Sequence, residues 1–388
     1  MQEVWDVIVV GGGPAGSFAA RKIAEAGYSV LVVDRKKVIG EPNHCGEGIS
    51  INCLAEVGVR PPQPWILREV KGGRLIFPNG TTIYFPKKGY CIDRPSFDRF
   101  LADRAAKAGA EVRTSTTVKW IRGERSGWVV MTERCEFRGR YLVGAGGALC
   151  PVAGYFGQRS PVLPALQYKF KAVSVTGVTG VCDDWLQFHH HEEFKGGYAW
   201  VFHRGKELSV GAGSPQDIKK RLERFCRRAG LNPDERTKTE GGPIPFLKRP
   251  LQIAFPRALL AGDAGGFTYP FTKGGVHGAV WSGRIAGEVI AEALKKGDSY
   301  LLSEYPHRVR IYPCRNPLHL MIPQAFFGFD NRIINTIGRI MDGKNYTEIP
   351  VGRFLRYFLA KPSPRILWGI AIGFLVQRFY HHSEQFAW

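Results

Sequence analysis

The sequence predicts a protein of the α/β class, and three features of the chain carry this prediction. An apolar run at residues 4–10 leads directly into a glycine-rich turn and a helix-forming segment. A short apolar run, glycines and a long helix-forming segment follow one another again at residues 259–296. Residues 66–90 and 161–244, between these two segments, are rich in β-forming stretches. With 388 residues, the chain is long enough for two or three domains.

The composition narrows the class of protein. Apolar residues make up 44% of the chain and charged residues 23%, which excludes a disordered or fibrous protein. No apolar stretch reaches the roughly 18 residues that a membrane-spanning helix needs, and residues 1–6 do not resemble a secretory signal. The eight cysteines form no C-x-x-C pair. This favours reduced thiols in a cytoplasmic protein over a disulfide scaffold, and we expect no metal site.

The chain is strongly basic, with 54 Lys and Arg residues against 34 Asp and Glu residues and a formal net charge of +20. No basic run is longer than three residues and no nucleic-acid motif is present, so we expect no nucleic-acid partner. Dispersed basic charge fits an anionic membrane surface or an anionic substrate better. A solvated basic surface that only aids solubility is an equally good interpretation.

The N-terminal segment predicts a nucleotide site. Residues 4–10 read as a buried strand, residues 17–26 as a helix that ends at Gly27, and residues 28–33 as a second strand. The glycines of the turn have the G-x-G-x-x-G spacing, which lets the backbone approach a pyrophosphate at a helix N-terminus. An acidic residue after the second strand can accept hydrogen bonds from ribose hydroxyls. The residues expected at this site are Gly11, Gly13, Pro14, Ala15, Gly16, Asp34 and Arg35.

A second segment with nucleotide-binding features lies late in the chain. Residues 259–261 read as a short buried strand, Gly262 and Asp263 follow it, and a long helix is expected from about Gly274 to Lys296. The chain has only one G-x-G-x-x-G fingerprint, so no separate nicotinamide domain is predicted. The external reductant stays open, because NADPH, a deazaflavin or a ferredoxin could each serve.

Together these segments resemble the flavoprotein oxidoreductases of the glutathione-reductase and hydroxybenzoate-hydroxylase type. The resemblance implies a Rossmann-type, glutathione-reductase-like domain that binds FAD, with Asp263 on the ribityl chain and Gly274 and Gly275 at a helix N-terminus facing the flavin. By the same resemblance Arg94, in an R-x-x-F-D-x-x-L segment, contacts the FAD; a helix cap or a surface charge is the alternative. Gly146 stands where many relatives carry Asp, which weakens a hydroxylase interpretation.

Two narrower motifs make the sequence similar to the geranylgeranyl reductase family of flavoproteins. The first is the run C-G-E-G at residues 45–48, and the second is a Y-x-W-x-F stretch at residues 198–202. The likeness covers residues 1 to about 300, although this chain lacks the two prolines that flank the aromatic motif in the family. It implies an FAD-dependent reductase that saturates carbon–carbon double bonds of isoprenoid chains, an enzyme of lipid biosynthesis.

The resemblance also implies roles for the C-G-E-G loop. Cys45 and Gly46 would lie against the flavin, and Cys45 would supply a proton to the substrate double bond, since a thiol can act as an acid or a nucleophile. Glu47 is the alternative acid. A small apolar loop residue without a chemical role is the alternative interpretation of Cys45.

An aromatic face is expected on the strand at residues 198–202, because alternate side chains of a strand point to one side. Three aromatic rings on one face can line a long apolar slot, or they can pack in the core of a sheet, and the pattern alone does not choose. The family resemblance favours a slot that binds the substrate. The residues concerned are Tyr198, Trp200 and Phe202.

Three consecutive histidines stand at residues 189–191. His189 and His191 would fall on one strand face, so an H-x-H metal site is conceivable. A half-exposed strand with alternating polar residues is favoured, and no residue is predicted to bind a metal ion.

The C-terminal region differs in composition from the rest of the chain. Residues 301–388 contain 11 Lys and Arg residues against 5 Asp and Glu residues, and several prolines break up short helices. The apolar run at residues 366–376 is too short to span a bilayer. A helix on the membrane interface and a helix packed over the catalytic domain or in a dimer are equally good interpretations.

The predicted organisation has three parts. The FAD-binding domain is discontinuous and comprises residues 1–65, 91–160 and 245–300. A β-rich substrate domain is inserted as residues 66–90 and 161–244, and residues 301–388 form a helical C-terminal region.

The predicted partners follow from this function. The predicted substrate is an isoprenoid lipid or an isoprenyl diphosphate. The electrons are expected to come from the external reductant or a redox donor protein. The predicted location is the cytoplasm, and peripheral contact with the inner face of the membrane is left open. Two alternatives remain, an FAD-dependent monooxygenase of the aromatic-hydroxylase type and a flavoprotein that transfers electrons to quinone. The second usually carries a Cys-ligated cluster, which the scattered cysteines do not offer.

Overall fold

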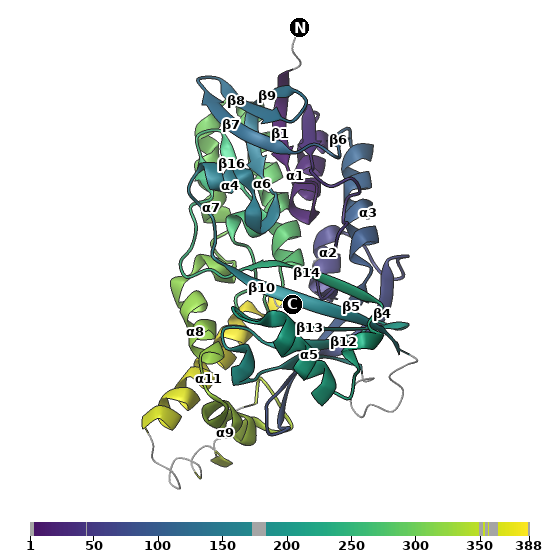
Figure 1. Cartoon of the computed structure of the whole chain (residues 1–388). Helices are drawn as coiled ribbons and strands as arrows, with labels where there is room; N and C mark the ends of the chain where they lie inside the picture. The colour runs from purple at the N-terminus through teal and green to yellow at the C-terminus, as the bar shows by residue number, and fades with distance from the viewer. Residues whose placement is uncertain are drawn as a thin grey trace.

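The computed structural model describes residues 4–43, 45–172, 184–348, 352, 353, 356 and 364–386. Two sheets make up the body of the molecule. One occupies the upper half of Figure 1 and the other the lower half, and the late, yellow-green helices lie at the lower left. The candidate site lies between these two sheets.

The upper sheet is a parallel sheet with a short antiparallel extension. Its parallel strands stand in the order β16 (Ala258–Leu260), β9 (Glu136–Gly144), β1 (Val4–Val10), β2 (Val30–Val33) and β6 (Glu111–Arg113). The antiparallel strands are β15 (Ala254–Phe255) beside β16, β8 (Gly127–Thr132) beside β9, and β7 (Val118–Glu124) beside β8. Residues 7–10 of β1 and all four residues of β2 are buried, which is why both segments are continuous apolar runs.

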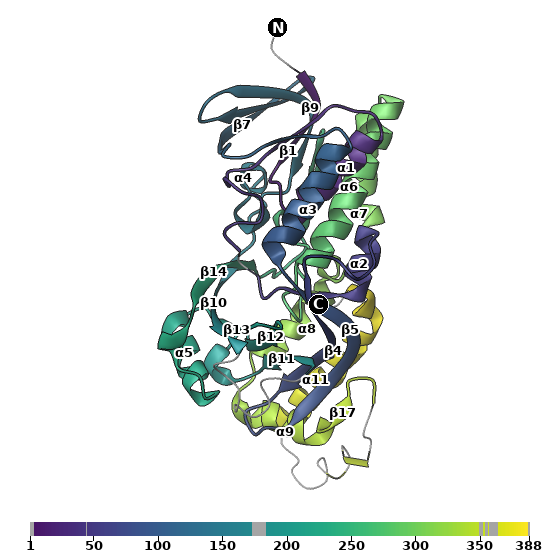
Figure 2. The same cartoon turned by 90° about the vertical axis from the view of Figure 1, so that its right-hand side faces the viewer.

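Helices cover one face of the upper sheet. They are α1 (Pro14–Glu25), α3 (Arg94–Lys107) and α6 (Val276–Lys296), which run side by side in Figure 2, with the short α2 (Ile51–Val57) packed against α6. Helices α1 and α6 approach closely through glycine, since a Cβ on Gly283 would lie 2.3 Å from the carbonyl oxygen of Ala15. The Rossmann-type fold predicted from the N-terminal strand, turn and helix is confirmed.

The predicted ends of these elements need small corrections. The first strand spans residues 4–10 as predicted, but α1 begins at Pro14 rather than at residue 17, because extended Gly13 precedes a proline at the first helical position. The second strand begins at Val30 rather than at residue 28. The late strand ends at Leu260, and the long helix begins at Val276 after Gly275.

The lower sheet is mostly antiparallel. Its strands stand in the order β14 (Lys238–Pro245), β10 (Val162–Lys171), β13 (Glu207–Gly213), β12 (Ala199–His203), β11 (Trp185–His189), β4 (Ile66–Ile76), β5 (Thr82–Ile92) and β17 (Lys344–Asn345), with β3 (Gly48–Ser50) also beside β5. Helix α5 (Ile218–Arg228) covers one face of this sheet through Leu222, Phe225 and Cys226. The other face is therefore free to meet the residues of the upper half.

The predicted division into domains does not follow the sheets completely. Strand β3 lies in the range assigned to the FAD-binding domain and β17 in the C-terminal region, yet both pair with β5 of the lower sheet. Strands of two or three residues have no periodicity that a sequence could show. The domain boundaries themselves stay a prediction.

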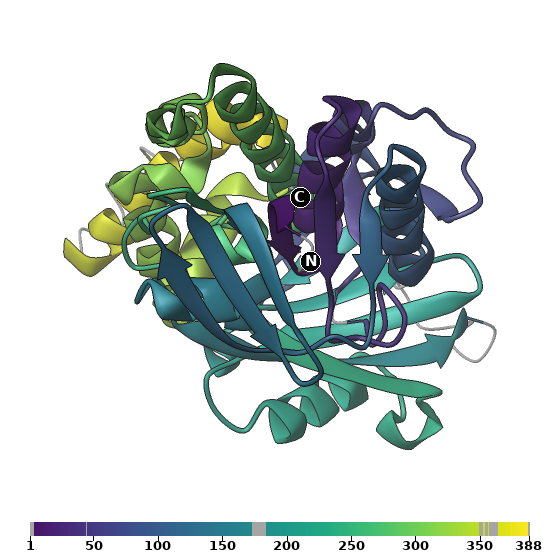
Figure 3. The same ribbon diagram turned by 90° about the horizontal axis from the view of Figure 1, so that it is seen from above.

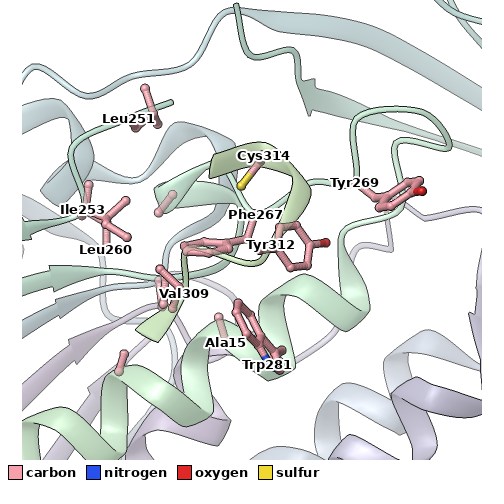
Figure 4. Packing of buried hydrophobic residues seen from close by; sticks show 14 of the residues in the cluster. Ala15, Leu251, Ile253, Leu260, Phe267, Tyr269, Trp281, Val309, Tyr312 and Cys314 are labelled. Carbon is pink, nitrogen blue, oxygen red and sulfur yellow. The ribbon is translucent and has the colours of Figure 1, made fainter. Parts of the chain in front are cut away.

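The C-terminal segment packs on the upper and lower halves. Its helices are α7 (Glu304–Arg308), α8 (Pro317–Phe327), α9 (Asn331–Met341) and α11 (Pro364–Ser383), gathered at one side of the molecule in Figure 3. Figure 4 shows Tyr312 beside both Phe267 and Trp281. The centroid of its ring lies 5.5 Å from the centroid of each of these rings. Helix α11 lies across α8 and α9. In the described part of the chain, no helix is long and apolar enough to cross a membrane.

Candidate active site

The glycine-rich turn after β1 packs tightly on one side and is open on the other. Gly11 has φ +110°, and a Cβ there would lie 2.5 Å from the carbonyl oxygen of Ala145. A Cβ on Gly16 would lie 1.8 Å from the carbonyl oxygen of Gly11. Above Gly13, by contrast, there is open space, and the N-terminus of α1 has no side-chain cap. Its free N–H groups can therefore receive a phosphate.

Asp34 stands at the end of β2 beside this turn. Its Oδ2 accepts a hydrogen bond from the N–H of Gly12 at 2.7 Å, and its Oδ1 accepts one from the N–H of Lys36 at 2.8 Å. The carboxylate thus orders the turn and still lines the cavity in front of α1. This position suits a carboxylate that accepts from ribose hydroxyls.

The late glycine segment forms the opposite wall. Asp263 lies in the 3-10 turn η5 (Gly262–Gly265), and its Oδ1 accepts a hydrogen bond from Thr268 Oγ1 at 2.9 Å. A Cβ on Gly275 would lie 2.9 Å from the same oxygen, so only glycine lets α6 start this close to the carboxylate. Burial raises the pKa of Asp263. The N-terminus of α6 carries no side-chain cap either, so it too can face a ligand.

Arg94 belongs to the cavity wall rather than to the surface. The helix cap is Asp93, whose Oδ2 accepts from the N–H of Ser96. The Arg94 guanidinium donates to both oxygens of Asp98 at 3.1 Å, and its side chain is 14% exposed. This placement excludes both alternative interpretations of Arg94, a helix cap and a surface charge.

One cavity of about 560 Å³ joins these parts, a volume in the usual range for a cofactor or ligand site. All but one of the predicted site residues line it; Gly16 instead packs behind the turn. The functional roles of these residues stay predictions. The residues that line the cavity are Gly11, Gly13, Pro14, Ala15, Asp34, Arg35, Cys45, Gly46, Glu47, Arg94, Tyr198, Trp200, Phe202, Gly262, Asp263, Gly274 and Gly275.

The C-G-E-G loop lies where the two sheets meet. The N–H of Glu47 donates to Cys45 Sγ at 3.2 Å, and Glu47 has φ +69°. A Cβ on Gly46 would lie 2.9 Å from Phe202 and 3.5 Å from Nε1 of Trp200. The loop therefore needs glycine to touch the aromatic strand, and it places the thiol at the border between the glycine turns and the aromatic side chains.

The aromatic face forms on β12 as predicted, although Tyr198 lies just before the strand. Trp200 and Phe202 are each 7% exposed, and the Tyr198 hydroxyl donates to the carbonyl oxygen of Thr272. The rings pack in the core and also line the cavity, and their role as a substrate slot stays a prediction. Gly211 on β13 stands opposite Trp200 and leaves room for the indole.

Two small apolar cavities continue the large one away from the glycine turns. The nearer one, about 20 Å³, shares Phe188, Tyr198 and Thr272 with the large cavity. The farther one, about 50 Å³, shares Leu75, Phe85 and Phe271 with the nearer one. It ends at residues of α9 and α11, namely Ile337, Ile340, Met341, Gly373, Phe374 and Val376. A row of apolar spaces thus leads from the thiol loop to the C-terminal helices.

Sequence reasoning missed a buried group of charges beside the thiol loop. Lys169 Nζ contacts Glu47 Oε2 and lies 3.7 Å from Glu240 Oε2, and Arg204 Nη1 lies 3.0 Å from Glu47 Oε2. Gln167 Nε2 donates to the carbonyl oxygen of Cys45 at 2.8 Å and to Glu240 at 2.6 Å. The available signal was the alternation of Gln167 and Lys169 with apolar residues along β10.

The histidines do not form a metal site. His190 is 1% exposed, its Nε2 lies 3.2 Å from the carbonyl oxygen of Phe326, and burial lowers its pKa to about 4. The predicted strand ends at His189, so His190 lies beyond it and is covered by α8, while His189 and His191 are half-buried. Among the residues that the structure describes, no group of three or more His, Cys, Asp and Glu side chains is arranged to hold a metal ion.

FAD fits the groups that line the large cavity. The uncapped N-termini of α1 and α6 offer N–H donors for a pyrophosphate and for the flavin ring, and Asp34 and Asp263 offer carboxylate oxygens for hydroxyl groups. Open space above Gly13 and the close approach at Gly275 leave the room that the cofactor backbone needs. The donor set and the shape of the cavity therefore agree with FAD.

Comparisons with known proteins agree with this site. Residues 6–40 match the model of a family of FAD-dependent oxidoreductases. The chain is 31% identical to digeranylgeranylglycerophospholipid reductase 1 of Methanothermobacter thermautotrophicus, over 93% of this chain and 96% of the relative. It is also 31% identical to digeranylgeranylglycerophospholipid reductase of Methanothrix thermoacetophila, over 94% of this chain and 97% of the relative.

A solved structure is similar over the whole chain. The crystal structure of a geranylgeranyl bacteriochlorophyll reductase-like protein from Thermoplasma acidophilum superposes with a TM-score of 0.80 and 26% identity, covering 96% of this chain and 100% of that one. The identity and coverage of the curated relatives, together with the flavin-compatible cavity, show that the chain belongs to the digeranylgeranylglycerophospholipid reductase family of FAD-dependent oxidoreductases.

Proposed function

We propose that this protein uses FAD to saturate carbon–carbon double bonds in the geranylgeranyl chains of an isoprenoid lipid. The observation that carries the proposal is a single cavity that joins two glycine-rich helix N-termini to an aromatic wall, with Cys45 at the border. The names of the curated relatives, which are reductases of a lipid with two geranylgeranyl chains, support the substrate class. An isoprenyl diphosphate is the other substrate with the same chain.

The residues that would hold the cofactor divide between the two walls. Gly13, Pro14 and the N-terminus of α1 would receive the pyrophosphate, and Asp34 the ribose. Asp263 and the N-terminus of α6 would hold the ribityl chain and the flavin ring. When bound and reduced, FAD supplies a hydride to one carbon of the double bond.

The chain's own residues would complete the reduction. Cys45 would give a proton to the other carbon, and Glu47, two residues away and also lining the cavity, is the alternative acid. Tyr198 and Trp200 would hold the apolar chain, exclude water and stabilise positive charge that develops on a tertiary carbon. The apolar spaces behind Tyr198 would take the part of the chain beyond the reacting bond.

A peripheral position on the membrane follows from a lipid substrate, and we place it on the inner face, with the protein otherwise in the cytoplasm. Helices α8 and α11 expose large apolar side chains, Leu318, Met321, Trp368 and Leu375, which are 44–62% accessible. Exposed apolar residues of this kind mark surfaces that meet a membrane or a protein. The net charge of +20 would favour anionic headgroups.

Electrons would come from outside the chain. One glycine fingerprint serves the FAD site, so we propose an external reductant, NADPH, a deazaflavin or a ferredoxin-like donor protein. Neither alternative function gains support from the comparisons. Gly146 argues against a hydroxylase, and the described residues offer no cluster ligands for electron transfer to a quinone.

The decisive experiment is mass spectrometry of a geranylgeranyl lipid after anaerobic incubation with the FAD-loaded protein and dithionite. A product series that rises by about two mass units per reduced bond is expected, because each bond gains a hydride and a proton. Replacement Cys45→Ala should slow the reaction, whereas unchanged lipid in the presence of reducible flavin would refute the proposed function for the lipid tested.

A further inference from the structure

A neutral cluster of four charged side chains is buried beneath the thiol loop. Glu47, Lys169, Arg204 and Glu240 are each at most 6% exposed. Lys169 contacts Glu47 and lies 3.7 Å from Glu240, while Arg204 pairs with Glu47 at 3.0 Å. Burial of charges costs several kcal/mol per ion unless each is well paired, so a sheet gains little stability from such a cluster.

The cluster reaches the protein surface at its far end. Glu240 Oε1 lies 2.6 Å from Nζ of Lys238, whose side chain is 61% exposed. At its near end, Glu47 lies in the same tight loop as Cys45 and lines the cavity. The ionisable groups Lys238, Glu240, Lys169 and Glu47 thus form a continuous row from solvent to the thiol loop.

The reaction creates a need for such a row. Each saturated double bond takes up one proton in addition to a hydride. An isoprenoid chain that fills the aromatic slot excludes water from the side on which Tyr198 and Trp200 lie. Protons must then reach the acid at residue 45 or 47 from another direction, and the buried cluster lies on that other side, along β10 and β14.

We propose that Lys169 is a proton-relay residue, which passes a proton to Glu47 and receives one from Glu240. This inference rests on the reduction proposed above. Cys45 gives its proton to the alkene carbon while the hydride, with its two electrons, forms the other C–H bond. The Glu47 carboxylate takes a proton from the Lys169 ammonium and passes it to the thiolate. The Glu240 carboxylate then takes a proton from solvent at Lys238 and returns it to Lys169. One solvent proton is consumed for each bond reduced, and all four groups end as they began.

The electrostatic surroundings of Glu47 suit a carboxyl that exchanges protons. Burial raises its pKa, and Arg204, Lys169 and the backbone N–H of Arg94 oppose that shift. Because burial outweighs these contacts, the pKa of Glu47 stays raised, and its carboxylate takes up a proton more readily than an ordinary one. The charged and titratable groups facing Glu47 are Lys169 of β10, Arg204 between β12 and β13, Arg94 of α3, Cys91 of β5 and Cys45, with Glu240, Lys238 and Glu207 behind them.

The test compares Lys169→Met with Lys171→Met, the same change at an exposed site on the same strand. The FAD-loaded proteins are mixed with geranylgeranyl lipid and excess dithionite without oxygen between about pH 6 and 9. Mass spectrometry of the lipid over many turnovers gives the rate, because only repeated turnover requires Cys45 to regain its proton. For Lys169→Met we expect a loss of about 10²-fold, which deepens as pH rises and is partly restored by a small amine such as ethylamine. Lys171→Met should match the wild type.

A second measurement does not depend on turnover. Infrared titration of the resting, FAD-loaded protein follows the protonated carboxyl of Glu47, identified by its absence from Glu47→Gln. Loss of the Lys169 charge should raise the fraction of protonated Glu47 at neutral pH, because a cation that lowers its pKa is gone. If Lys169→Met does not fold, the double variant Lys169→Met/Glu240→Gln keeps the cluster neutral while the row stays broken.

The outcomes separate the two proposals. A slowed variant with an altered pH profile and amine rescue supports the relay. A variant that turns over repeatedly at the wild-type rate, or one that is equally slow at every pH and is not rescued, overturns it and leaves Lys169 a structural residue. A wild-type protein whose reduced flavin no isoprenoid lipid oxidises overturns the proposed function and the relay with it.

Discussion

The substitution Gly211→Ala is expected to disable lipid reduction while FAD binding survives. Gly211 on β13 stands directly opposite Trp200 on β12. A Cβ at this position would lie 2.2 Å from Cζ2 of Trp200, whereas ordinary contact begins at 3.4 Å, so the indole must move by about 1.2 Å. Gly46 closes the space around the indole nitrogen, since a Cβ there would lie 3.5 Å from Nε1. The indole therefore has to shift along the aromatic wall.

The magnitude follows from this displacement. Overpacking of a core position costs about 1–3 kcal/mol of folding free energy. A misplacement of about 1 Å at a group that positions substrate can lower the rate by about 10²-fold. FAD content should stay at the wild-type level, because the glycine turns and Asp263 do not touch Gly211. Flavin absorbance, thermal unfolding and the anaerobic rate with geranylgeranyl lipid measure the three quantities separately.

Gly213→Ala is the matched control on the same strand. A Cβ there would meet Cδ2 of Leu163 at 2.9 Å, the flexible end of an aliphatic side chain that can turn away. This variant should lose stability without a comparable loss of rate. The reasoning is refuted if Gly211→Ala reduces lipid as fast as the wild type, or if both variants slow the reaction equally.

Three further outcomes are expected. Arg94→Met removes the guanidinium that pairs with the buried Asp98, so it should lower the free energy of unfolding by about 3–5 kcal/mol and lower the FAD content. The double variant Arg94→Met/Asp98→Asn should recover the stability but not the FAD content. Intact FAD content in either variant would contradict the site. Burial lowers the pKa of His190 from 6.5 to about 4. The free energy of unfolding should therefore be highest above about pH 6.5 and fall by about 3 kcal/mol as the pH drops to about 4. Urea unfolding of His190→Gln should depend less on pH than that of the wild type. Trp368→Glu should reduce sedimentation with anionic vesicles, whereas the exposed Trp120→Glu, on β7, should not; equal binding by all three proteins would exclude this membrane face.

The nucleotide half of the protein could be read from the sequence because its chemistry is local. Strand, glycine turn and helix follow one another within residues 4–25, and steric contacts such as that of Gly16 with Gly11 require glycine whatever the distant surroundings. The aromatic face at residues 198–202 was visible for a similar reason, since strand alternation fixes it. Each of these signals needs only neighbours in sequence.

The charged cluster could not be read in this way, because it joins residues far apart in the chain. Lys169 meets Glu47 across 122 positions, and Gln167 meets Glu240 across 73. A lysine within an apolar strand indicates a buried or edge position, but only the tertiary structure brings its carboxylates, Glu47 from the thiol loop and Glu240 from β14. The short strands β3 and β17 were not predicted for the same reason, because their pairing with β5 depends on the tertiary structure.

The lower sheet explains why apolar and charged groups meet at the thiol. Leu75, Phe188, Trp200, Gly211, Gln167 and Glu240 stand opposite one another across six strands, in one row on one face. The first three residues of this row are apolar, the fourth is a glycine and the last two are polar. The gap at Gly211 holds the indole on one side, while Gln167 on the other donates to the Cys45 carbonyl oxygen. A one-residue slip of β10 would turn Gln167 and Lys169 toward α5 and bring Leu166 and Tyr168 to the loop, so the register of this strand decides both the slot and the supply of protons.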